Sequence, residues 1–161
     1  MTGRENFNDE EWNEIRRFPV LVAALISAVD YSSLSEFKEF NAFATFIHKA
    51  GARRKKSPLI AELLEDTIEV NVEIFVDHCN HVAASLSGDK PIEAALNHAR
   101  DIGILIDERL PKKAAATYKG FVMEVAVVVA RAHKESMLPF ASSISKVEDF
   151  HIRRLNQAIR V

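Results

Sequence analysis

The sequence predicts an all-α fold, a single-domain bundle of six or seven helices. Apolar residues recur at the three- and four-residue spacing of amphipathic helices and do not alternate as they would in strands. Prolines and glycines separate these stretches, and several begin with a Ser or Asn followed three residues later by Glu, the pattern of a capping box. A chain of 161 residues can form one core that buries about 70% of its unfolded surface.

The first helices are predicted on either side of Pro19. Asn8 with Glu11 forms a capping box for a short helix that ends before Pro19, because proline interrupts a helix interior. Pro19 then begins a second helix to about Val29, apolar on every side. Residues 1–8 are expected to be a flexible N-terminal extension of a domain that spans 1–161.

The next helix is predicted to begin with Ser33 and Glu36 as its capping box and to end at Gly51. A stripe of large apolar residues follows one face of it: Phe37, Phe40, Phe43, Phe46 and Ile47. Proline or serine starts the remaining predicted segments: Ser57–Pro58 toward Leu86 with a possible break near Asp66, Pro91 to about Leu110, Pro111 to about His133, and a last helix from Ser145 with Glu148.

Two features suggest how these helices are organised. Residues 34–40 parallel residues 144–150, and each segment follows an apolar helix and a polar loop, which predicts a pseudo-duplicated plan. Gly103 and Gly120 interrupt helical patterns at a cost of about 1 kcal/mol each relative to Ala, so close helix contacts are expected at both.

Charge and composition restrict the location and partners. The 21 Lys and Arg nearly balance 23 Asp and Glu, so no overall field favours nucleic acid or anionic lipid. Met1 to Trp12 lacks a signal-peptide pattern, and no apolar stretch reaches the roughly 18 residues of a membrane span. The only cysteine, Cys79, cannot form an internal disulfide, and a cytoplasmic protein without an integral membrane segment is expected.

The loop between Asp30 and Glu36 is the first candidate site. It brings two carboxylates together with Ser32 and Ser33, and hard cations such as Ca²⁺ and Mg²⁺ prefer such oxygen ligands. A structural role accounts for the same residues, because Glu in a first turn complements the helix dipole and Asp commonly ends a helix.

A second candidate lies in the segment after Pro58, where carboxylates recur three or four residues apart, His81 continues the row and His78 lies close to it: Glu62, Asp66, Glu69, Glu73 and Asp77. Inward carboxylates and histidines can hold iron or manganese in a helical bundle, so a carboxylate–histidine metal enzyme is the second alternative function, although a solvated face is the commoner reason for such a stripe. The run from Arg53 to Lys56 is predicted to be a solvated loop.

No nucleophile elbow, phosphate loop or zinc-protease motif is present, so no enzyme activity is predicted.

Residues near both ends of the chain resemble the TerB-like tellurite-resistance family. The first stretch combines Glu10-Glu11-Trp12 with Arg17-Phe18-Pro19 and an apolar helix. The second combines Phe121 to Ala126, Leu138-Pro139-Phe140 and the Ser145-x-x-Glu148 segment. The resemblance implies an all-helical fold with pseudo-repeated halves and a non-enzymatic role in tellurite resistance or stress response.

The resemblance also implies a divalent metal ion, Ca or Mg in preference to Zn, at Asp30 and Glu36 and at Glu148 in the second half. The sequence departs from the family where Tyr31 follows Asp30 and where Lys134 occupies the second-half site. A helical interaction module, either a homodimer or a partner of other stress-response proteins, is the alternative function without a metal.

Overall fold

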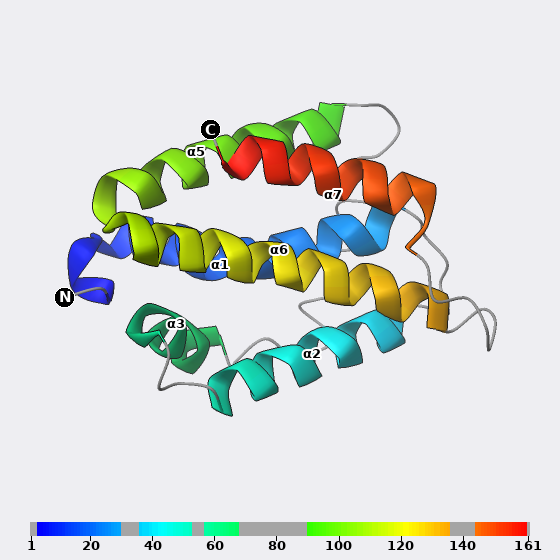
Figure 1. Ribbon diagram of the computed structural model, residues 1–161, viewed down its shortest axis with the longest axis horizontal. Coiled ribbons are helices and arrows are strands. Elements are labelled where there is room, and N and C mark those ends of the chain that lie inside the picture. Colours follow the sequence, from blue (N-terminus) through cyan, green and yellow to red (C-terminus); the bar gives the residue numbers. More distant parts are fainter. Residues whose placement is uncertain (1–2, 30–35, 53–56, 68–89, 136–143, 161) are drawn as a thin grey trace.

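The structure, a computed structural model, describes residues 3–29, 36–52, 57–67, 90–135 and 144–160, and these residues are helical with no strand among them. A short 3₁₀ helix, η1, precedes six α-helices in this part of the chain (Figure 1). The α-helices are α1 (Asp9–Val29), α2 (Glu36–Ala52), α3 (Pro58–Thr67), α5 (Lys90–Arg109), α6 (Lys112–Glu135) and α7 (Lys146–Ile159). The all-α prediction is confirmed.

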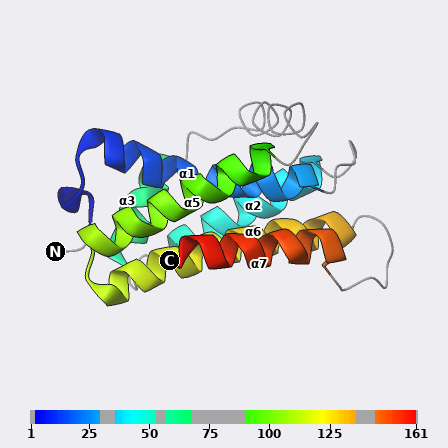
Figure 2. The ribbon, with the colours of Figure 1, turned by 90° about the horizontal axis from the view of Figure 1, so that it is seen from above.

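Helices α1 and α6 form the centre of the bundle and pack along each other (Figure 1). Helices α2 and α3 lie on one side of this pair, where α2 packs mainly on α6. Helices α5 and α7 lie side by side on the opposite side, as the view from above also shows (Figure 2). This arrangement leaves both central helices with packing partners on two sides.

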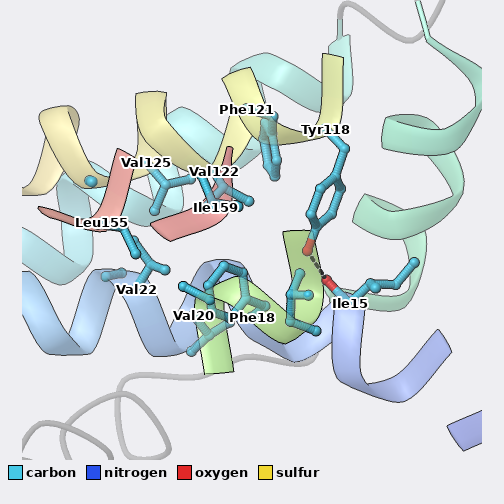
Figure 3. Close-up of a cluster of buried hydrophobic side chains, with 14 of the residues drawn as sticks. Ile15, Phe18, Val20, Val22, Tyr118, Phe121, Val122, Val125, Leu155 and Ile159 are labelled. Atoms are coloured by element: carbon cyan, nitrogen blue, oxygen red, sulfur yellow. Dashed lines mark hydrogen bonds between the residues drawn. The ribbon is translucent and has the colours of Figure 1, made fainter. Parts of the chain in front are cut away.

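The apolar helices predicted around residues 20–29 and 122–132 are the two central ones. Val20 and every residue from Val22 to Ala28 are buried in α1, and Val122, Val125, Ala126 and Val129 are buried in α6. Leu155 and Ile159 of α7 complete the cluster from one side (Figure 3). Burial of such side chains stabilises the fold by about 1.5–3 kcal/mol each relative to leaving them exposed.

The boundary predicted at Pro19 is wrong, because α1 continues through that residue as one helix. Proline has no N–H and leaves the carbonyl of the residue four positions earlier without its helical donor. That carbonyl belongs to Ile15, and the hydroxyl of Tyr118 in α6 donates a hydrogen bond of 2.8 Å to it in the buried core (Figure 3). A distant side chain therefore replaces the bond that Pro19 cannot make. With this merger, the described part of the chain contains six α-helices.

The helix starts predicted at Asn8, Pro58, Pro91, Pro111 and Ser145 agree with the structure, whereas Ser33, the predicted cap of α2, lies outside the described residues. Asn8 and Glu11 form a capping box in which Asn8 N donates to Glu11 Oε2 at 2.9 Å and Glu11 N donates to Asn8 Oδ1 at 2.8 Å. Pro58 begins α3, and Pro91 and Pro111 lie within one residue of the starts of α5 and α6. The part of the predicted fourth segment beyond Thr67 lies outside the described residues.

Residues 3–8, where an extension was expected, pack against the bundle. Arg4–Asn6 form the 3₁₀ helix, and Arg4 N donates a 2.7 Å hydrogen bond to Glu62 in α3. Phe7 lies against Trp12, with ring centroids 6.1 Å apart. This N-terminal segment therefore covers one edge of the core.

The phenylalanine stripe of α2 faces inward as predicted. Phe40 and Phe43 are buried, and Phe46 stacks on Phe121 of α6 with ring centroids 5.7 Å apart. The side chain of Phe37 lies outside the described part. Helix α2 continues to Ala52, so Gly51 is within the last turn and does not end the helix.

The two interior glycines differ in their surroundings. A Cβ atom added at Gly103 in α5 would lie 2.4 Å from the carbonyl oxygen of Ile159, so the predicted close helix contact is confirmed there. A Cβ atom at Gly120 in α6 would meet no atom within 4 Å, so the same prediction is wrong for Gly120.

Among the described helices, none is both long and apolar enough to cross a membrane.

Candidate functional site

The predicted acidic positions belong to one end of the bundle. Helix α1 ends there at Val29, immediately before Asp30, while α2 and α7 both begin there (Figure 1). Asp30 lies outside the described residues, and Glu36 is the first residue of α2, with its side chain outside the described part. The geometry of the predicted Asp30–Glu36 pair therefore stays a prediction.

A buried polar contact lies between α1 and α2, close in sequence to both predicted ligands. Ser27 of α1 and Glu39 of α2 are almost fully buried, and the Ser27 hydroxyl donates a hydrogen bond to Glu39 Oε2. Glu39 is only 1% exposed. Because burial of a carboxylate without partners is costly, a hydrogen-bond donor such as Ser27 is needed at this position.

This pair lies close in sequence to the predicted loop site. Ser27 precedes Asp30 by three residues, and Glu39 follows Glu36 by three residues. Residues three apart within α2, such as Glu36 and Glu39, are one helical turn removed from each other along the chain. The Ser27–Glu39 contact therefore lies one helical turn inward from the positions at which α1 ends and α2 begins.

Sequence reasoning missed Ser27 and Glu39 as site residues. A signal was present, because Glu39 precedes the buried Phe43 by four residues and so shares the face that the phenylalanine stripe marks as inward. Ser27 likewise interrupts the apolar run of α1, in which its neighbours Ile26 and Ala28 are both buried. In both helices, a polar residue on an otherwise apolar face indicates a buried polar side chain.

Glu148, the predicted second-half ligand, forms the cap of α7. Its backbone N–H donates to Ser145 Oγ at 3.1 Å, and its carboxylate oxygen Oε2 accepts from Ser145 N at 3.0 Å. The side chain is 1% exposed. The predicted capping box is thus confirmed, and it gives the buried carboxylate a structural role that requires no metal.

Several other candidates fall partly or wholly outside the described residues. These are the run from Arg53 to Lys56, Cys79, and the two histidines of the proposed carboxylate–histidine centre, His78 and His81. Glu62, at the start of that carboxylate row, accepts the hydrogen bond from Arg4 N. Within the described ranges, no three His, Cys, Asp or Glu side chains gather closely enough to hold a metal ion.

The acidic start of α1 is tied to the end of α5. Glu11 accepts hydrogen bonds from the backbone of Asn8 and from the guanidinium of Arg109, whose Nε lies 3.2 Å from Glu11 Oε1. The backbone bond from Asn8 lowers the pKa of the Glu11 carboxyl most, and Arg109 lowers it further. This cluster of Asn8, Glu11 and Arg109 lies at the N-terminal end of α1. It joins that end of α1 to the C-terminal end of α5.

Comparison of the chain with protein-family models, with curated proteins and with solved structures gives no match. The resemblance to the TerB-like family therefore stays a prediction that depends on the motifs in the sequence.

Proposed function

We propose that this chain is a non-enzymatic, cytoplasmic, TerB-like helical protein of tellurite resistance or stress response that binds a divalent cation. The cation is held where α1 ends and α2 begins, by the carboxylates of Asp30 and Glu36. Ca²⁺ or Mg²⁺ is favoured over Zn²⁺, because the available ligands are oxygen atoms and neither cysteine nor histidine is part of the set.

The single observation that supports this proposal is the buried contact between Ser27 and Glu39. Its hydroxyl and its carboxylate belong to residues three positions before Asp30 and three positions after Glu36 in the sequence. Cations of this type take six or more oxygen ligands, more than two monodentate carboxylates supply. Glu39 is the residue that could add a further carboxylate oxygen from the inner side of the site, and water molecules would complete the coordination.

The experiment is calorimetric titration of the purified full chain with Ca²⁺, Mg²⁺, Mn²⁺ and Zn²⁺. Wild type is expected to bind Ca²⁺ or Mg²⁺ at one site, and the double variant Asp30→Asn with Glu36→Gln is expected to bind at least tenfold more weakly, about 1.4 kcal/mol. The matched control is Asp101→Asn with Glu108→Gln, which removes two exposed carboxylates from α5 and should leave binding unchanged.

Elemental analysis of the purified protein separates this proposal from the enzyme alternative. Stoichiometric iron or manganese that survives the Asp30–Glu36 double variant would favour a carboxylate–histidine centre with His78 and His81. Absence of binding heat for all four ions would overturn the cation site. Equal binding by wild type and the double variant would overturn its location.

A further inference from the structure

We draw no further inference here: the strongest candidate, the pair of exposed apolar side chains of Val147 and Phe150 near the start of α7, carries none because nothing in the structure shows what covers them.

Discussion

Replacement of Tyr118 by Phe tests how α1 passes through Pro19. The substitution keeps the ring and removes only the hydroxyl that donates to the Ile15 carbonyl. Ile15 is completely buried, and Pro19 offers no N–H in place of the lost donor. A buried acceptor left without a partner costs about 1–3 kcal/mol. The free energy of unfolding should fall by this amount, which corresponds to a melting temperature lower by roughly 2–12 °C for a chain of this size.

The Pro19→Ala background supplies the control, because alanine restores an N–H that can donate to Ile15. In that background Tyr118→Phe should cost about 1 kcal/mol less than in wild type, since the carbonyl keeps a donor. Urea denaturation followed by circular dichroism measures all four free energies of the cycle. Equal costs of Tyr118→Phe in both backgrounds would refute the explanation, as would a cost below about 0.5 kcal/mol in wild type.

The burial of Tyr118 also predicts how the stability of the protein depends on pH. Desolvation raises the pKa of the Tyr118 hydroxyl well above its ordinary value. A raised pKa in the folded state means that stability is fully present below about pH 10, the pKa of an unfolded tyrosine, and is lost as the pH rises above it. Wild type should therefore lose stability above pH 10 more steeply than Tyr118→Phe.

Two further predictions concern the two interior glycines and the ion pair between Glu11 and Arg109. Gly103→Ala should destabilise the protein by about 1–3 kcal/mol, because the added methyl group meets the backbone of Ile159, whereas Gly120→Ala, with open space around it, should stabilise it by about 0.5–1 kcal/mol. Urea denaturation of both variants decides this, and the same sign for both would contradict it. Glu11→Gln should reduce stability at pH 7, and the difference from wild type should disappear as the pH falls through the lowered pKa of Glu11, below its ordinary value near 4.3. A difference in denaturation midpoint that persists at pH 2 would refute the assigned role of this carboxylate.

The helix starts could be predicted because their causes are local in sequence. Asn8 with Glu11 and Ser145 with Glu148 satisfy backbone groups within three residues, so the sequence pattern contains the whole interaction. The continuation through Pro19 could not be predicted, because the compensating hydroxyl of Tyr118 is 103 residues away along the chain. Propensity rules carry no information about such a partner.

The two interior glycines show the same limit. Both interrupt helical patterns, yet only Gly103 lies where the end of another helix approaches closely. The difference depends on how α5 and α7 pack and not on the residues that flank each glycine. For the candidate site, the sequence indicated the loop between Asp30 and Glu36 but not the inner contact of Ser27 and Glu39, which depends on how α1 meets α2.

Four buried polar side chains bear on whether the contact between Ser27 and Glu39 has a function. Tyr118 satisfies a carbonyl that Pro19 leaves without a donor, and Glu148 caps α7, so each stabilises a backbone group that would otherwise lack a partner. The contact of Ser27 with Glu39 instead joins two side chains. Replacement of both partners of a buried hydrogen bond by apolar groups of the same shape can be nearly neutral for stability. Because Ser27 and Glu39 are each three residues from a predicted ligand in the sequence, titration of a Glu39→Gln variant with Ca²⁺ tests whether this contact contributes to the proposed cation site.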